Sequence, residues 1–129
     1  ATLDGRMRIE ISGDDAVFDD QAATSVALLF HELATNAAKY GALSVEGGAI
    51  TLNTRNEGGR FILVWEERGG PHVAGEPSRT GFGSSLATLS VENQLGGRLE
   101  RIWAPEGLRV TADLPATALS RRRAAQIVA

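Results

Sequence analysis

Apolar residues recur at helical spacing over residues 21–40 and predict a helix with one apolar face. Asp19 or Asp20 is the expected N-cap, because a carboxylate accepts hydrogen bonds from the free amides of the first turn. Gly41 is expected to end the helix, since glycine takes the left-handed conformation at no steric cost. The expected members of the apolar face are Val26, Phe30, Leu33, Ala37 and Tyr40.

Three polar residues, Glu32, Asn36 and Lys39, lie at positions i, i+4 and i+7 on the other side of this predicted helix. The spacing places them within roughly 60° of one another. A polar stripe opposite an apolar one is typical of any surface helix, so the stripe alone does not indicate a site. Two glycine-rich turns further along, at residues 67–71 and 81–85, form an ordered set with the helix. The chance that all three features occur together in this order is far lower than the chance that any one of them occurs alone.

Alternation of apolar and polar residues predicts strands elsewhere in the chain. The expected strands are residues 7–11, 49–54, 60–66, 98–103 and 108–115, with a short one at Val17 and Phe18. The run 60–66 is the most apolar, which favours a central position in a sheet. Residues 67–80 lack periodicity and predict a loop, and a loop of this length is usually functional. Helical spacing returns from Phe82 to Gln94.

This order of elements favours an α/β two-layer sandwich, in which a mixed, largely antiparallel sheet packs against about three helices. A doubly wound parallel sheet would need strand–helix alternation throughout, and the chain lacks it. We expect one domain over residues 1–115. Residues 116–129 are rich in Ala and Arg and are expected to form a C-terminal tail or linker.

The composition is that of an ordinary globular domain, with 129 residues, 43% hydrophobic and 22% charged. The net charge is -3 and basic residues gather only at residues 121–123, which disfavours nucleic-acid binding. The chain has no cysteine and two histidines, so thiolate chemistry is excluded and a multi-histidine metal site is disfavoured. No apolar run approaches the roughly 18 residues of a membrane span, and no secretory signal opens the chain. We therefore expect a cytoplasmic domain without direct membrane contact.

Several common catalytic motifs are missing from the sequence. There is no Gly-x-x-x-x-Gly-Lys-Ser/Thr loop and no Gly-x-Gly-x-x-Gly after a predicted strand. Residues 81–85 lack the second glycine in the register of a Gly-x-Ser-x-Gly elbow. Walker-type phosphate binding and serine hydrolysis are therefore poorly supported.

The helix and the two glycine-rich turns resemble the ATP-binding domain of sensor histidine kinases, of the Bergerat or GHKL superfamily, and are most similar to its HWE subfamily. Residues 31–44 look like the N box of that subfamily, and residues 65–67 like its Trp-x-Glu signature. Residues 68–71 extend the signature as a first glycine box, and residues 81–84 resemble the second. The resemblance covers residues 7–115. It includes His31, Trp65 and Glu67, the three residues whose one-letter codes give the subfamily its name.

The resemblance implies that the predicted helix binds Mg²⁺ and phosphate. Asn36 would offer its carbonyl oxygen to Mg²⁺, which prefers hard oxygen ligands. Lys39 would pair with a phosphate as a point charge. Glu32 would act as general base, or as a metal-shell residue that reaches the metal through water. His31, counted with Glu32 as a catalytic residue, would shape the site more than react.

The glycine-rich turns are implied to hold the adenine and the phosphates. Glu67 stands where related kinases carry an Asp that accepts the adenine amino group, so the base would lie slightly further away or be reached through water. Gly69 and Gly70 would let the chain pass close to the base, because no Cβ intervenes. Residues 71–80 would form the ATP lid, and amides at the start of the following helix would bind phosphate. The implied ATP-binding residues are Asn36, Lys39, Tyr40, Glu67, Gly69, Gly70, Arg79, Gly81, Phe82, Gly83 and Ser84.

A histidine kinase also needs an acceptor histidine on a dimerising helical hairpin, and neither His31 nor His72 lies on one. We therefore expect a catalytic fragment that works with its own dimerisation and phosphoacceptor domain and with a response regulator receiver domain. Two alternatives stay open: a GHKL-type ATPase or serine kinase, and a degenerate nucleotide-sensing module. The presence of Glu32, Asn36 and Lys39 with both glycine boxes argues against a degenerate module.

Overall fold

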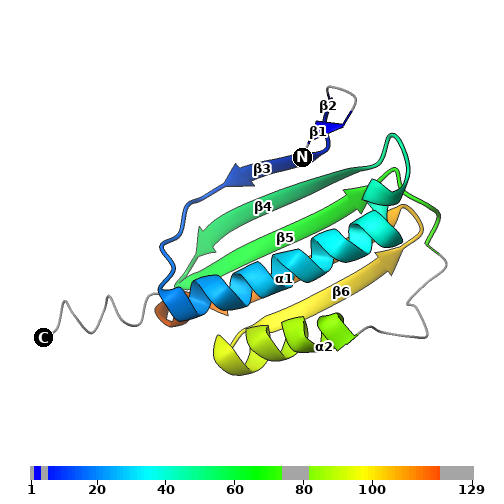
Figure 1. Cartoon of the computed structure of the whole chain (residues 1–129). Coiled ribbons are helices and arrows are strands. Elements are labelled where there is room, and N and C mark those ends of the chain that lie inside the picture. Colours follow the sequence, from blue (N-terminus) through cyan, green and yellow to red (C-terminus); the bar gives the residue numbers. More distant parts are fainter. Residues whose placement is uncertain (1, 4–5, 74–81, 120–129) are drawn as a thin grey trace, which may run out of the picture.

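A computed structural model describes residues 2–3, 6–73 and 82–119 of the chain. Within these residues a five-stranded sheet forms one layer, and two α-helices lie across one of its faces (Figure 1). The helices are α1 (Asp20–Lys39) and α2 (Phe82–Leu89), which continues into a π-helical segment, η2 (Ser90–Gln94). The sheet consists of β3 (Ile9–Gly13), β4 (Ala49–Glu57), β5 (Arg60–Arg68), β6 (Arg98–Ala104) and β7 (Gly107–Pro115). Shorter elements are β1 (Thr2–Leu3), β2 (Arg6–Met7) and the 3-10 segments η1 (Ala42–Ser44) and η3 (Ala116–Ala118).

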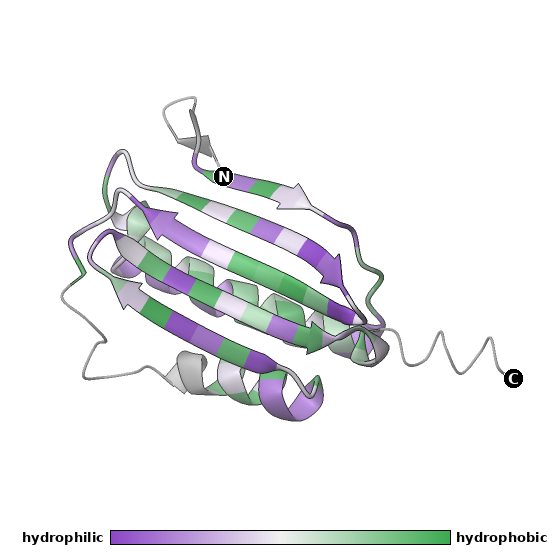
Figure 2. Ribbon diagram, turned by 180° about the vertical axis from the view of Figure 1, so that it is seen from behind, coloured by the Kyte–Doolittle hydropathy of each residue, from purple (hydrophilic) through white to green (hydrophobic). Residues whose placement is uncertain are grey.

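The strands follow the order β3-β4-β5-β7-β6, which confirms the predicted mixed, largely antiparallel sheet and the two-layer sandwich. β3 and β4 pair in parallel, because α1 carries the chain back across the sheet between them. The other three pairs are antiparallel. β5 lies in the centre, as its apolar run predicts. Its middle is hydrophobic and its two ends are hydrophilic (Figure 2).

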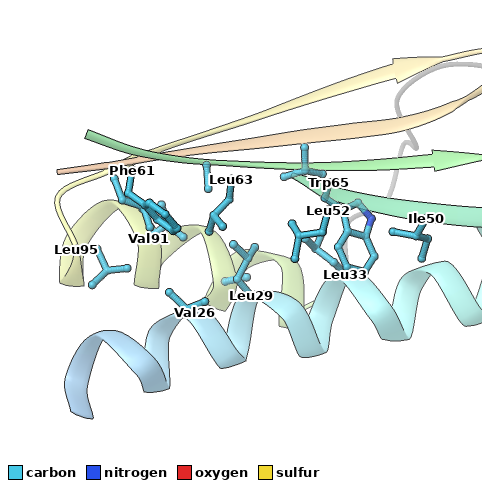
Figure 3. Packing of buried hydrophobic residues seen from close by; sticks show 14 of the residues in the cluster. Val26, Leu29, Leu33, Ile50, Leu52, Phe61, Leu63, Trp65, Val91 and Leu95 are labelled. Carbon is cyan, nitrogen blue, oxygen red and sulfur yellow. The ribbon is translucent and has the colours of Figure 1, made fainter. Parts of the chain in front are cut away.

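The hydrophobic core lies between the sheet and the helices (Figure 3). From α1, Val26, Leu29 and Leu33 point toward the sheet and are at most 4% exposed. Removal of this apolar surface from water is the main force that holds the two layers together. The rest of the buried cluster is Ala22, Ala37, Ala42, Ile50, Leu52, Phe61, Leu63, Trp65, Ala87, Val91, Leu95, Leu108, Val110, Ala112, Leu114 and Leu119.

The apolar face of α1 differs from the predicted one. Leu29 is 2% exposed and belongs to the core, whereas Tyr40 is 74% exposed. Tyr40 is the C-cap of α1, so the helical period no longer governs the direction of its side chain. Phe30 is half-buried at the edge of the core, where its ring stacks on that of Trp65 with centroids 6.5 Å apart.

The two ends of α1 confirm one prediction and correct another. Asp19 is the N-cap, and its carboxylate accepts a hydrogen bond from the Ala22 amide at 2.8 Å. The left-handed conformation expected of Gly41 is wrong, because its φ is -110°. The Gly41 amide instead donates to the carbonyl oxygens of Asn36 and Ala37, which closes the last turn. Gly41 is needed for a different reason, given below.

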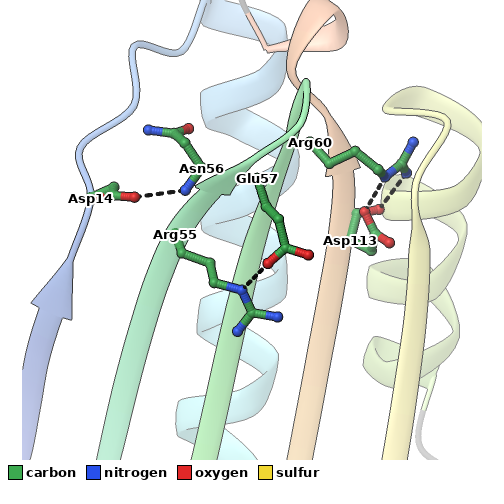
Figure 4. Close-up of polar contacts among 6 residues, drawn as sticks. All are labelled: Asp14, Arg55, Asn56, Glu57, Arg60 and Asp113. Atoms are coloured by element: carbon green, nitrogen blue, oxygen red, sulfur yellow. Dashed lines mark hydrogen bonds and ion pairs between the residues drawn. The ribbon is translucent and has the colours of Figure 1, made fainter.

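The short strand expected at Val17 and Phe18 is also wrong, because these residues form no regular structure. A strand that continued β3 alongside β4 would need the amide of Asn56. That amide donates to the side chain of Asp14 at 2.8 Å (Figure 4). The pairing therefore ends at Gly13, and the chain leaves the sheet edge toward the N-cap of α1.

The far end of the sheet, around the β4–β5 turn, carries charged pairs on its surface. Gly58 and Gly59 form the turn with φ of 55° and 82°. Arg55 Nε donates to Glu57 Oε2 at 2.6 Å, and Arg60 pairs with Asp113 on the neighbouring strand β7 (Figure 4).

Packing continues past residue 115, where the domain was expected to end. Ala118 and Leu119 are 8% and 3% exposed, and the Leu119 carbonyl accepts a hydrogen bond from the Asp19 amide at 2.6 Å. The division into a catalytic and ATP-binding domain over residues 1–115 and a tail or linker over 116–129 stays a prediction. No helix among the described residues is long and apolar enough to cross a membrane.

Candidate functional site

Glu32 and Asn36 form a hydrogen-bonded pair on one flank of α1. The Asn36 Nδ2 donates to Glu32 Oε1 at 2.8 Å, and both side chains are half-buried. Their flank is the one that carries Ser25 and Leu28, which line a groove of about 360 Å³ between α1 and η2. The pair therefore lies on the side of α1 that faces the second helical segment. The predicted line of polar groups is confirmed in these two members.

The other α1 residues of the predicted site are more exposed. Lys39 is the last residue of the helix, and its exposed side chain follows Asn36 by three positions. Tyr40 is exposed just beyond it. His31 is exposed and lies roughly 100° around the helix from Glu32, so the structure does not bring these two together on one face.

Glu67 is buried at the end of β5, with 6% of its surface exposed. Its Oε1 accepts a hydrogen bond from the Ala42 amide at 3.1 Å, and its Oε2 accepts one from Trp65 Nε1 at 3.0 Å. Trp65 and Glu67 are two positions apart on one strand, so their side chains lie on the same, helix-facing side of the sheet. The Trp-x-Glu spacing thus allows the indole N–H of Trp65 to donate a hydrogen bond to the carboxylate of Glu67.

Close backbone contacts surround this carboxylate. A Cβ added at Gly41 would lie 2.1 Å from Glu67 Oε1, and one added at Gly70 would lie 2.8 Å from the Ala42 Cα. Gly69 has a φ of 75°, and its added Cβ would lie 2.8 Å from the Gly47 carbonyl oxygen. Gly69 and Gly70 therefore let the chain after β5 pack against the segment between α1 and β4. Glu67 lies between these glycines and the end of α1.

The second glycine-rich turn is described only in part. Arg79 and Gly81 lie outside the described residues. Phe82, Gly83 and Ser84 begin α2, which packs beside α1 and runs in the opposite direction (Figure 1). The first turn of α2 thus lies toward the half of α1 that carries Glu32 and Asn36. Its backbone amides are donors that suit an anion.

One buried charge at this end of the molecule was missed by sequence reasoning. Arg8 is 9% exposed, and its guanidinium donates to three carbonyl oxygens of the segment between α1 and β4. The alternation over residues 7–11 assigns Arg8 to the solvent side of a strand. No local signal in the sequence distinguishes it from an ordinary surface arginine.

Comparison with known proteins finds relatives of one kind. No protein-family model matches the chain. It is 40% identical over 110 residues to blue-light-activated histidine kinase 1 of Erythrobacter litoralis. The aligned residues cover 84% of this chain and 30% of the relative. It is 36% identical over 110 residues to the blue-light-activated histidine kinase of Rhizobium johnstonii, covering 84% of this chain and 32% of the relative. The chain thus spans about a third of these relatives.

Solved structures share the fold. The blue-light activated histidine kinase EL346 of Erythrobacter litoralis superposes with a TM-score of 0.71 over 94% of this chain and 38% of that one, at 23% identity. The catalytic domain of the histidine kinase ThkA gives a TM-score of 0.63 over 85% of this chain and 81% of that domain, at 18% identity. ThkA in complex with its response regulator TrrA gives a TM-score of 0.64 over 87% of this chain and 35% of that one, at 19% identity.

The sandwich is the fold of histidine kinase catalytic domains. The chain is homologous to histidine kinases over about a third of their length, and its motifs fit the HWE subfamily.

Proposed function

We propose that the chain binds Mg²⁺–ATP and, in a longer protein, presents the γ-phosphate to an acceptor histidine on a separate helical dimerisation domain. The observation that carries the proposal is the placement of Glu32, Asn36 and Glu67. Glu32 and Asn36 form a bonded pair on the C-terminal half of α1, and Glu67 at the end of β5 is bonded to the segment that follows α1, in a chain 40% identical to a histidine kinase.

The residues of α1 suit a magnesium ion that is shared with phosphate. A carboxylate and an amide in hydrogen-bond contact offer the hard oxygen atoms that Mg²⁺ prefers. No group of three or more His, Cys, Asp or Glu side chains gathers as a metal cage in the part of the chain that is described. This donor set fits a Mg²⁺ bound by one or two protein oxygens together with the phosphates of the nucleotide. The metal, when bound, offsets the negative charge of those phosphates.

Glu67 is the residue we propose for recognition of adenine. Its carboxylate is oriented by two donors, and each oxygen has further lone pairs with which to accept from an amino group or a water. An acceptor held in place distinguishes adenine, which presents an amino group there, from guanine, which does not. Gly69 and Gly70 are proposed to let the chain pass close to the base, because neither carries a Cβ.

The phosphates would lie between the end of α1 and the start of α2. Lys39 supplies a positive charge that is exposed, and so able to reach an anion. The first amides of α2, at Phe82, Gly83 and Ser84, supply donors at the positive end of a helix dipole. Arg79 and Gly81 are proposed to complete this part of the site.

The proposed reaction is in-line phosphoryl transfer. An imidazole nitrogen of the acceptor histidine attacks the γ-phosphorus, the bond from the γ-phosphorus to the bridging oxygen breaks, and ADP leaves. Glu32 is proposed to receive the proton of the imidazole, directly or through water. Positioning and charge neutralisation account for most of such catalysis. His31 is proposed to shape this region rather than react.

The proposed partners lie outside this chain. They are its own phosphoacceptor domain and a response regulator receiver domain, which takes the phosphoryl group on an aspartate. ThkA, a histidine kinase of the same fold, forms a complex with a response regulator, which supports the second partner. The cytoplasm, where ATP and receiver domains occur, is the compartment we propose.

Titration with a non-hydrolysable ATP analogue, with and without Mg²⁺, tests the binding proposal. The wild-type chain is expected to bind more tightly when Mg²⁺ is present. Asn36→Ala should lose this dependence on Mg²⁺, because it removes a metal ligand. Asn53→Ala, which changes an exposed asparagine of β4, is the matched control and should keep it. Unchanged Mg²⁺ dependence in Asn36→Ala would refute the metal role.

The full-length protein tests the transfer step. Incubation with ATP should produce an acid-labile phosphohistidine, and Glu32→Gln should slow its formation while ATP binding remains. Acid-stable phosphoserine would instead favour a serine kinase, and phosphate release alone an ATPase. Binding without any of these products would indicate a nucleotide-sensing module.

A further inference from the structure

Arg8 is a buried arginine whose described partners are all main-chain carbonyl oxygens. It stands between β2 and β3 and is 9% exposed. Its Nε donates to the Gly48 carbonyl at 2.9 Å, and its Nη2 donates to those of Ala42 at 2.9 Å and Val45 at 2.5 Å. None of the ion pairs among the described residues includes it. Burying a guanidinium is costly unless it is fully bonded, so these three bonds tie Arg8 firmly to the segment 41–48.

The same segment is held from the other side by Glu67. The carbonyl of Ala42 accepts from Arg8, while the amide of Ala42 donates to Glu67 Oε1 at 3.1 Å. A single residue of the main chain therefore stands between a buried cation and a buried carboxylate. The two bonds engage the adjacent peptide groups that share the Ala42 Cα, so a shift of one of these peptides moves the other.

Glycine contacts prevent this segment from moving independently. A Cβ added at Gly48 would lie 1.8 Å from the Ala42 carbonyl oxygen, and one at Gly70 would lie 2.8 Å from the Ala42 Cα. Ala42 itself is 1% exposed. Because close-packed backbones surround Ala42, a shift of its peptide must displace the first glycine box and the carboxylate of Glu67.

We propose that Arg8 is a positioning residue for recognition of the nucleotide base. It fixes the Ala42 main chain, and Ala42 in turn fixes Glu67. This inference rests on the proposed function, in which Glu67 accepts the adenine amino group. Arg8 lies between β2 and β3, away from the strand of Glu67 and 34 positions from Ala42, and it makes no described contact with Glu67 itself. Its effect on the base is therefore indirect.

The test measures the dissociation constants of ATP and GTP, and the melting temperature, for four versions of the 129-residue chain. These are wild type, Arg8→Met, Arg8→Lys and Arg60→Met. Arg60→Met is the matched control, because it removes an arginine that also bonds a main-chain carbonyl, together with a carboxylate, but at the opposite end of the sheet. Arg8→Lys keeps a buried cation and covers the case in which Arg8→Met does not fold.

Arg8→Met should lower the preference for ATP over GTP about tenfold or more, since loss of a buried hydrogen bond corresponds to roughly a tenfold change in an equilibrium constant. Arg8→Lys should lower this preference about threefold. Arg60→Met should lower the melting temperature and leave the preference unchanged. A lower melting temperature with an unchanged preference in either Arg8 variant that folds would show a merely structural role and overturn the inference alone. A wild-type chain that binds no ATP would overturn the proposed function and this inference with it.

Discussion

The two ends of the sheet contain the same kinds of charged residue in opposite surroundings. At the hairpin end, which comprises residues 55–60 and Asp113, arginines and carboxylates pair with each other at the surface (Figure 4). At the loop end, which comprises Arg8, residues 41–48 and Glu67, the charges of Arg8 and Glu67 are buried and each binds the main chain. Exposed side chains at the hairpin end retain up to 63% of their surface. Arg8 and Glu67 retain 9% and 6%.

This difference shows which charges determine structure. A surface pair gains little, roughly 0–1 kcal/mol, because water competes for both partners. A buried charge bound to the backbone cannot exchange its partner for water, so the backbone must stay where the charge needs it. The loop end is therefore the part of the sheet whose conformation is fixed, and it is also the end where the proposed site lies.

Glycines serve different purposes at the two ends. Gly58 and Gly59 have positive φ and open space around the position of a Cβ, so they are needed for the conformation of a turn. Gly41 and Gly70 have ordinary φ but no room for a Cβ. They are needed for close approach of two backbones. A glycine that is required for contact rather than for turning shows where two chain segments meet.

The largest effect is expected from Glu67→Ala. It leaves the Ala42 amide and the Trp65 indole N–H buried without an acceptor, at about 1–3 kcal/mol for each. We expect a loss of about 2–5 kcal/mol in the free energy of unfolding and loss of the preference for ATP over GTP. Urea unfolding and nucleotide titration measure the two effects. Glu66→Ala, on the opposite face of β5, should change neither by much. A Glu67→Ala chain as stable as wild type would show that water replaces the carboxylate.

Gly41→Ala should have the next largest effect. Its Cβ would lie 2.1 Å from Glu67 Oε1, so the carboxylate or the end of α1 must move. We expect a cost of about 1–3 kcal/mol, as for other overpacked sites, and weaker ATP binding. Melting curves and titration provide the measurement. Stability within error of wild type would mean that Glu67 swings aside easily, contrary to the fixed loop end described above.

Gly58→Asn should have a small effect. Asn adopts the left-handed conformation more readily than most residues, and nothing lies within 4 Å of the added Cβ. We expect less than about 1 kcal/mol in the free energy of unfolding and no change in ATP binding. A loss as large as that of Gly41→Ala would remove the distinction between turning and contacting glycines.

Arg55→Ala should have the smallest effect. Its ion pair with Glu57 joins two side chains that are 51% and 63% exposed. We expect a change of less than about 0.5 kcal/mol, which falls further at high salt. Urea unfolding at two salt concentrations measures it. A salt-sensitive loss above this value would show that the hairpin end is more cooperative than its exposure indicates.

Sequence patterns predicted the layers, the central strand and an aspartate cap at position 19 or 20, because these depend on periodicity and on local capping chemistry. They also predicted that Glu32 and Asn36 share one side of the helix, which follows from the helical repeat, and the structure adds the hydrogen bond between them. Contacts between segments that are distant in the sequence could not be predicted from these patterns. The role of Gly41 depends on Glu67, and the burial of Arg8 depends on carbonyl groups up to 40 positions away. Neither relation leaves a trace in local composition.

The hydrogen bond from the Asp19 amide to the Leu119 carbonyl has a practical consequence for recombinant work. Motif boundaries suggest a cut after Pro115, the last residue of β7. Such a cut would delete two buried side chains, those of Ala118 and Leu119, and would leave the cap of the longest helix without its acceptor. Truncations of this domain, and of relatives aligned to it, should therefore keep the chain at least through position 119.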